Sequence, residues 1–78
     1  MVYFTCLDVL KQHPKRYVAQ QLKDEEGLFW RLVGVFPQNN GFVLYRDLVI
    51  ATDTLDELKV FCDLHNVKIH HKEKYKES

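Results

Sequence analysis

The chain has 78 residues, 46% of them apolar, and its 11 Lys and Arg balance 11 Asp and Glu, so the formal net charge is zero. This length predicts a single small domain, residues 1–78, which buries only about 60–65% of its unfolded surface. The neutral charge argues against nucleic acid or an anionic membrane as the main partner.

The first 15 residues contain a short element whose pattern suits either a helix or a strand. Thr5 is a candidate N-cap for a short helix with Asp8 in its first turn, and a strand over Val2–Cys6 is the alternative. His13-Pro14 ends the element, because the residue before a proline is pushed out of the helical region. The segment lacks the basic start and long apolar run of a signal peptide, and nowhere does the chain approach the ~20 apolar residues of a membrane span. We therefore expect a cytoplasmic protein.

Three strands are predicted next, over residues 16–23, 28–36 and 42–51. A polar turn, residues 24–27, joins the first two, and Gly27 is suited to a positive φ there. Gly34, inside the second strand, indicates a bulge or a close backbone approach. Bulky apolar side chains occupy nearly every position of the second and third strands, so the sheet needs a cover on both faces.

The register of the hairpin formed by the second and third strands depends on Pro37. A two-residue turn at Asn40-Gly41 would place Pro37 opposite Leu44 at a hydrogen-bonded position, where proline has no N–H to donate. A five-residue loop, residues 37–41, avoids this problem and predicts four cross-strand pairs, one of them between a cation and an anion. The pairs are Phe36 with Phe42, Val33 with Tyr45, Trp30 with Leu48 and Arg31 with Asp47.

A capping box over residues 54–57 begins a helix that runs to about His65, with Asn66 as a suitable C-terminal residue. The inward stripe of this helix is predicted to be Leu55, Leu58, Phe61, Cys62 and His65. Residues 67–70 are a candidate last strand, and residues 72–78 are a polar tail that we expect to be frayed. The predicted fold is α+β: a three- to four-stranded antiparallel meander, with one C-terminal helix packed on the sheet and a short N-terminal helix.

Cys62 and His65 lie three residues apart on one helical face, and His70 and His71 follow, a spacing that resembles half of a zinc site. A fourth ligand, Cys6 or His13, would have to come from the other end of the chain. A core thiol with surface histidines is therefore favoured, and no metal or cofactor is predicted. Cys6 and Cys62 are expected to be free thiols. Since the chain has no nucleophile signature and no phosphate-binding glycine loop, we expect no enzymatic activity and infer no small-molecule substrate.

The favoured function is that of a small, non-enzymatic protein-interaction or regulatory module that acts as a homodimer. The C-terminal helix covers one face of the sheet, and the short N-terminal element cannot fully cover the other, so an apolar patch remains. An acidic surface on the helix would be a second docking site for a protein partner. The apolar patch comprises Phe29, Val33, Val43 and Tyr45, and the acidic surface comprises Asp53, Asp56, Glu57 and Asp63.

The alternative function is that of a nucleic-acid-binding accessory protein. Basic residues cluster near the N-terminus and in the C-terminal tail, where they would contact phosphates. Acidic neighbours dilute both clusters. The basic residues are Lys11, Lys15, Arg16, Lys72, Lys74 and Lys76.

Overall fold

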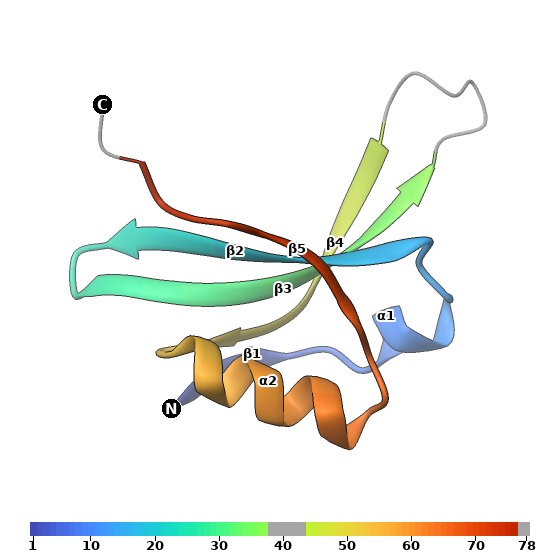
Figure 1. Cartoon of the computed structure of the whole chain (residues 1–78), viewed down its shortest axis with the longest axis horizontal. Helices are drawn as coiled ribbons and strands as arrows, with labels where there is room; N and C mark the ends of the chain where they lie inside the picture. Colours follow the sequence, from blue (N-terminus) through green and yellow to red (C-terminus); the bar gives the residue numbers. More distant parts are fainter. Residues whose placement is uncertain (38–43, 77–78) are drawn as a thin grey trace.

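A computed structural model of the protein describes residues 1–37 and 44–76 (Figure 1). These residues form five strands and two helices, which confirms the α+β class. In chain order the elements are β1 (Val2–Thr5), α1 (Asp8–Lys11), β2 (Arg16–Asp24), β3 (Gly27–Pro37), β4 (Leu44–Thr52), α2 (Leu55–Leu64) and β5 (Ile69–Glu73). No helix in this part of the chain is long and apolar enough to cross a membrane.

The five strands form one mixed sheet in the order β1-β4-β3-β2-β5. Strands β2, β3 and β4 are consecutive antiparallel neighbours, and β1 adds antiparallel to β4. β5 instead pairs parallel with β2. The predicted antiparallel meander is confirmed for β2, β3 and β4, but the sheet has five strands instead of three or four, and β5 is parallel instead of antiparallel. The reason is that α2 carries the chain from β4 back across the sheet, and a helical crossover of this kind joins parallel strands.

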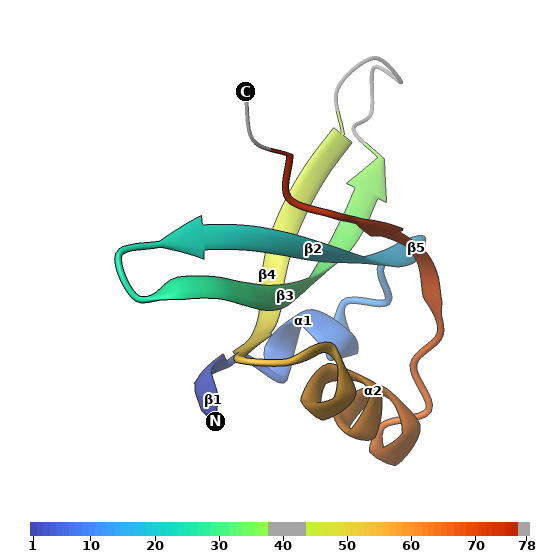
Figure 2. The same cartoon turned by 60° about the vertical axis from the view of Figure 1, so that its left-hand side comes forward.

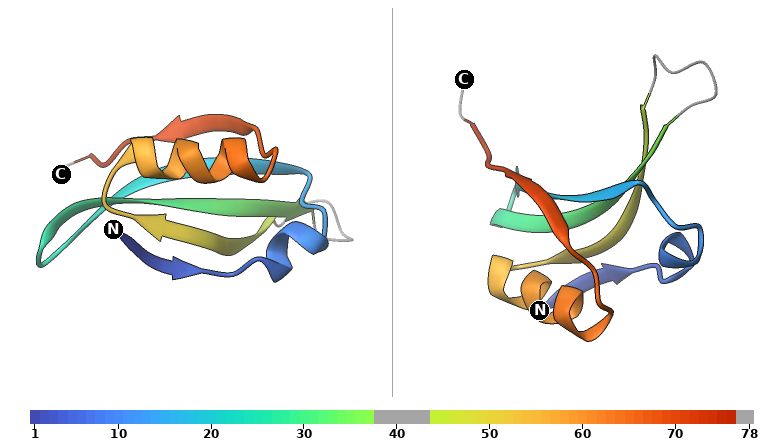
Figure 3. Two further views of the ribbon diagram at one scale, coloured as in Figure 1. Left: turned by 90° about the horizontal axis from the view of Figure 1, so that it is seen from below. Right: turned by 45° about the vertical axis from the view of Figure 1, so that its right-hand side comes forward.

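Both helices lie on the same side of the sheet, which we call the helix-covered face (Figures 2 and 3). The main core fills the space between this face and the helices, and it takes residues from α1, α2, β2, β3 and β4. Its buried members are Val9, Ala19, Trp30, Leu32, Val49, Ile50, Leu58, Phe61 and Cys62.

At the N-terminus, both of the alternatives raised by the sequence are present, one after the other. β1 occupies Val2–Thr5, and the short helix α1 begins at Asp8. Thr5 is therefore not the helix cap: the N-cap is Leu7, whose side chain makes no capping hydrogen bond. His13, immediately before Pro14, has a φ of 54° and ends the helical segment as predicted.

From Val33 to Pro37, the observed register of the β3–β4 hairpin differs from the predicted one by three residues. Val33 faces Leu48 instead of Tyr45, and Pro37 lies opposite Leu44, the register that the missing proline N–H argues against. An odd shift moves every side chain of one strand to the other face, so Tyr45 leaves the face that carries Val33. The predicted pairs of Trp30 with Leu48 and of Arg31 with Asp47 are also wrong, because Trp30 faces Thr52 and Arg31 faces Ala51. Pro37, predicted as the first residue of the loop, is the last residue of β3, and Phe36 faces Tyr45 instead of Phe42. The rest of the predicted loop, residues 38–41, lies outside the described residues.

A bulge explains why this register is stable. Leu32 pairs with Ile50 and Val33 pairs with Leu48, so Val49 is an extra residue on β4. Both Val49 and Ile50 reach the main core, where they are 0% and 2% exposed. Burial of such a side chain contributes about 1.5–3 kcal/mol, whereas one backbone hydrogen bond contributes about 1 kcal/mol. The free energy gained by burying these side chains is therefore larger than the free energy lost with the one hydrogen bond that Pro37 cannot donate.

Gly34 marks a close approach of α1 to β3, as predicted. A Cβ atom at this position would lie 2.6 Å from Pro14 Cγ and 3.1 Å from Val9 Cγ1. The end of α1 and the turn into β2 are thus seated directly on β3, which fixes where the first residues of β2 lie.

Helix α2 begins as predicted, with Thr54 Oγ accepting the Glu57 N–H at 3.3 Å. It ends at Leu64, one residue before the predicted end, and Asn66 follows the His65 cap with a φ of 57°, as suits the C-terminal residue that was predicted there. His65 is exposed, so it does not belong to the inward stripe. Beyond α2, strand β5 continues to Glu73, so the first two residues that we assigned to a frayed tail, 72 and 73, lie in the sheet.

Candidate functional site

All three arginines of the chain lie on the sheet face opposite the helices, which we call the arginine face. Arg16 on β2 and Arg46 on β4 both pair with Val35 on β3, and residues directly opposite one another share a face. Arg31 lies four residues before Val35 on the same strand, so alternation places it on this face as well.

A small second core lies in the middle of the arginine face. Val18, Val33 and Val35 are only 0%, 3% and 1% exposed, and Leu48 packs against them. No helix covers this cluster (Figure 3). Gln20, Arg31 and Arg46 lie on this face instead, linked by hydrogen bonds. Long polar side chains of this kind can cover apolar neighbours with their aliphatic stems while their charged ends stay in water.

Glu73 on β5 holds this polar cover together. Its Oε1 accepts hydrogen bonds from Gln20 Nε2 at 2.7 Å and from Arg46 Nη1 at 3.3 Å, and its Oε2 lies 3.1 Å from His71 Nε2. These contacts, the bond from Gln20 foremost, lower the pKa of Glu73 to about 2. Strands β3 and β2 separate β4 from β5, so the contact between Arg46 and Glu73 passes over the buried valines. Gln20 Oε1 also accepts from Arg31 Nε at 2.8 Å, which extends the network to β3.

The predicted apolar patch is not formed by the described residues. Val33 is buried beneath the polar cover, and Phe29 is partly buried on the same face. Tyr45 is 48% exposed, but it lies on the helix-covered face beside Phe36, with 6.0 Å between ring centroids. Val43 lies outside the described residues. Long polar side chains, and not only helices and strands, can cover a sheet face, so apolar residues on both faces do not by themselves predict an exposed patch.

Strand β1 forms a different apolar surface, at the edge of the sheet. It is the last strand in the sheet order, so one side of its backbone has no strand partner in the described chain. Half of the ten large apolar side chains that are exposed in this part of the protein belong to the first seven residues. They are Met1, Val2, Tyr3, Phe4 and Leu7, with exposures of 70%, 50%, 48%, 45% and 45%. Natural sheet edges usually carry a charge or a proline that blocks pairing, and Val2–Thr5 contains neither.

The four predicted acidic residues divide into two groups. Asp53 and Glu57 contact the start of β1: the Met1 amine lies 3.0 Å from Asp53 and 2.5 Å from Glu57, and the Tyr3 hydroxyl donates to Asp53. The hydrogen bonds to Glu57 and Asp53 raise the pKa of the Met1 amine. The other two acids, Asp56 and Asp63, are exposed on α2. Acidic groups thus rim one end of the apolar edge.

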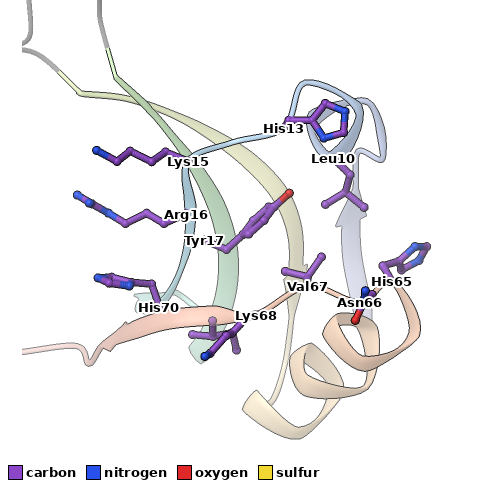
Figure 4. Close-up of a pocket in the computed structure, with 11 residues that line it drawn as sticks. Leu10, His13, Lys15, Arg16, Tyr17, His65, Asn66, Val67, Lys68 and His70 are labelled. Carbon is purple, nitrogen blue, oxygen red and sulfur yellow. The ribbon is translucent and has the colours of Figure 1, made fainter.

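A basic cleft lies where the start of β2 meets the connection from α2 to β5 (Figure 4). Its volume is about 710 Å³, and eleven residues from three segments of the chain line it. Six of the eleven are basic and none is acidic: His13, Lys15, Arg16, His65, Lys68 and His70. Leu10, Tyr17, Val67 and Ile69 form its apolar floor, which packs against the main core.

The side chains of Lys15, Arg16 and His70 point the same way, away from Tyr17 and towards the arginine face (Figure 4). The Tyr17 ring points the opposite way, to the side on which Leu10, Val67, His13 and His65 lie (Figure 4). Arg16 Nε is buried and has no hydrogen-bond partner in the described part of the chain. Burial raises the pKa of the Tyr17 hydroxyl.

Two of the six residues assigned to the alternative nucleic-acid surface, Lys15 and Arg16, line this cleft. Lys11 is exposed and lies 3.9 Å from Asp8. Lys72, Lys74 and Lys76 are exposed in and beyond β5, and none of them lines the cleft. His13 and Lys68 also line the cleft but were not predicted to belong to the nucleic-acid surface. The sequence does show two clusters of basic residues some 50 residues apart, but only the parallel pairing of β2 with β5 brings the two clusters together in the cleft.

Cys62 is poorly placed for nucleophilic chemistry. Cys62 is 4% exposed, and burial raises the pKa of its thiol to about 11. The ring centroids of His65 and Phe61 are 4.4 Å apart. No group of three or more potential metal ligands occurs among the described residues. Both cysteines are free thiols.

The chain matches no protein-family model, and no curated protein and no solved structure is significantly similar to it.

Proposed function

We propose that this protein is a non-enzymatic protein-interaction module that forms a homodimer by pairing β1 with β1 of a second copy. The observation that carries the proposal is the exposed, uncharged edge strand β1. Antiparallel pairing would satisfy the free backbone groups of both edges and would bury Val2, Tyr3 and Phe4. A two-fold arrangement brings the strand against itself, and no like charges within Val2–Thr5 oppose one another.

The surroundings of β1 fit the polar rim of an interface. Asp53 and Glu57 lie against Met1 at one end of the strand, outside the apolar centre formed by Tyr3 and Phe4. A strand of four residues buries less than the roughly 1,200–2,000 Å² of a standard interface. We therefore expect a dimer that dissociates at micromolar concentrations.

Light scattering between about 1 and 100 µM tests the proposal, and a Kd near the micromolar range is expected for so small an interface. Phe4→Lys places a charge in the centre of the edge and should leave a monomer at every concentration. Val60→Lys is the matched control, because Val60 is 67% exposed on α2 and lies outside β1; this variant should dimerise like the wild type. A wild type that stays monomeric at the highest concentration would contradict the proposal.

The acidic helix remains the competing docking surface, and a second variant separates it from β1. Asp56→Asn combined with Asp63→Asn removes the two exposed helix acids and leaves the contacts of Asp53 with Met1 and Tyr3 in place. If β1 is the interface, this double variant retains the dimer. Loss of the dimer in the double variant, with the dimer intact in Phe4→Lys, would assign the docking surface to α2.

A further inference from the structure

We propose that the arginine face binds single-stranded nucleic acid, with its cations on the phosphates and two phenylalanines of the same face against the bases. This side of the sheet is open, because both helices lie on the other side and no helix covers the small valine core (Figure 3). Each copy of the chain carries the whole face, so the proposal does not depend on the proposed dimer.

The strand register assigns side chains to this face in rows, because residues directly opposite one another share a face. Two such rows cross the sheet four residues apart on β3. The first row is Arg16, Val35 and Arg46, and the second, from β5 to β1, is Glu73, Gln20, Arg31, Ala51 and Phe4. Phe29 lies two residues before Arg31 on β3, so alternation places it on the same face.

Cations outnumber acids on this face, although the protein as a whole carries no net charge. Strand register places all three arginines there, and Lys15 and His70 point the same way as Arg16 (Figure 4). Within the described strands, the acids on this face are Glu73 on β5 and, at the far end of β2, Asp24. A surface with an excess of one charge concentrates ligands of the opposite charge. The arginine face is therefore suited to an anion.

The arrangement of the arginines suits a chain of phosphates. Arg31 donates through Nε to Gln20, and Arg46 donates through Nη1 to Glu73, so each keeps other N–H groups for a ligand. A guanidinium presents five N–H donors in a planar fork that matches two phosphate oxygens. Arg16 and Arg46 lie two strand spacings apart, roughly 10 Å, and Arg31 lies about 13 Å from their row along β3. Cations spread over such a distance fit several phosphates in succession better than one small anion.

Two aromatic side chains beside Arg31 indicate bases as the other part of the ligand. Phe29 is two residues away on β3, about 7 Å, and Phe4 lies two strands away, across Ala51. Phe4 is 45% exposed, and Phe29 is partly exposed. Unpaired bases stack on aromatic side chains that lie beside cations, with little preference for sequence. An acidic peptide would supply the charge without the flat rings.

A double helix fits this face less well than a single strand. In a duplex the bases are stacked on one another, so their flat sides cannot reach the phenylalanines. The major groove, about 12 Å wide, admits an α-helix or a two-stranded ribbon, whereas the arginine face belongs to a sheet of five strands. The occupant that combines phosphates with accessible bases is a single strand.

Fluorescence anisotropy with a labelled ten-nucleotide single-stranded DNA of mixed sequence tests the proposal. Binding at low salt should weaken as salt is added, with a slope of about 0.7 in log K against log salt concentration for each phosphate contact. Arg46→Ala should weaken binding about tenfold or more, the usual loss for a hydrogen bond to a charged group, and Arg46→Lys should recover only part of this loss. No binding at low salt would overturn the proposal.

Two exposed lysines form a matched pair that tests the charge argument. Lys15→Ala removes a cation that points towards the arginine face, whereas Lys59→Ala removes one from α2, on the other side of the sheet. Lys15→Ala should reduce the salt slope by about 0.7, the value for one phosphate contact. Lys59→Ala should leave the slope and the affinity unchanged. Equal effects of the two variants would mean that the attraction is nonspecific, and the proposal would fail.

Phe29→Leu tests the stacking argument without changing β1. It keeps an apolar side chain but removes the flat ring, so it should weaken binding about fivefold or more, with the salt slope of the wild type. The oligomeric state and the thermal unfolding midpoint, measured in parallel, should remain those of the wild type, which separates a lost base contact from a lost dimer or a lost fold. An unchanged affinity in Phe29→Leu would contradict the contact with bases.

Unlabelled competitors identify the class of partner. The single strand should displace the labelled probe at a lower concentration than a duplex of the same sequence or a peptide of ten glutamates does. A peptide at least as effective as the single strand would assign the arginine face to an acidic protein segment. A duplex at least as effective would assign it to double-stranded nucleic acid, and either result would overturn the proposal.

Discussion

The two faces of the sheet are both buried, but by different means. On the helix-covered face, large side chains such as Trp30 and Leu32 pack against α1 and α2 in one continuous core. On the arginine face, only small side chains are fully buried, and the cover is a network of polar side chains linked through Glu73. A strand pattern that is apolar on both faces therefore does not by itself predict an exposed patch. β-Branched residues of modest size, such as Val18, need only the stems of neighbouring long side chains above them.

This difference makes the two faces unequal in rigidity. The helix-covered face is closed by backbone and by interlocking side chains, and it tolerates little change in volume. The arginine face is closed by flexible side chains that can move and that depend on charge. A substitution on the helix-covered face should therefore lower the free energy of unfolding more than a matched substitution on the arginine face.

Overpacking of the helix-covered face should give the largest effect. Gly34→Ala introduces a Cβ atom 2.6 Å from Pro14 Cγ, so α1 or β3 must shift. We expect a loss of about 1–3 kcal/mol in the free energy of unfolding, measured by urea denaturation. Pro14→Ala removes the closest atom, so the double variant should lose less than the sum of the two single losses. Strict additivity would show that the contact with Pro14 is not the cause.

The sequence predicts the local elements of the fold well, because they depend on short-range chemistry. The capping box at Thr54, the left-handed Asn66 and the glycine contact at Gly34 are all visible in the spacing of residues. The hairpin register was wrong because a single missing donor at Pro37 was weighed without the burial that a bulge at Val49 provides. A bulge leaves no sign in a pattern where nearly every position is apolar.

The candidate sites were harder to predict than the elements. The basic cleft requires that residues 15–17 and 65–70 meet, and this follows from the parallel pairing of β2 with β5, which is a long-range event. The apolar edge β1 requires that Val2–Thr5 be a strand, which was only the alternative interpretation. Residue types could be read from the chain, but their assembly depended on the order of strands in the sheet.

A matched pair of valines compares the two faces directly. Val49 on the helix-covered face and Val18 on the arginine face are both 0% exposed. Val49→Ala should lower the free energy of unfolding by about 1.5–2.5 kcal/mol, since it removes two methyl groups from a core that is too rigid to fill the space. Val18→Ala should cost about 1 kcal/mol less than that, because polar side chains above it can settle into the space. Equal losses in urea denaturation would mean that the polar cover is as rigid as the helices.

Glu73 provides the smallest and most specific test, because it responds to pH. Its pKa in the folded protein is about 2, below its ordinary value of 4.5, owing first to the hydrogen bond from Gln20 and then to His71 and Arg46. A lowered pKa of an acid stabilises the folded state above pH 4.5, and this contribution is lost as the pH falls from 4.5 towards 2. Because the side chain is 37% exposed, solvent screens the contacts, and we expect the effect to be no more than about 1 kcal/mol.

The free energy of unfolding, measured by urea denaturation, should therefore fall less for Glu73→Gln than for the wild type when the pH is lowered from 6 to 2.5. Glu25→Gln, in the exposed turn between β2 and β3, is the control and should follow the wild type. If Glu73→Gln also follows the wild type, the carboxylate is not what holds the cover in place. The aliphatic stems of Arg31 and Arg46 would then seal the valines without it, and the arginine face would be closed by packing alone.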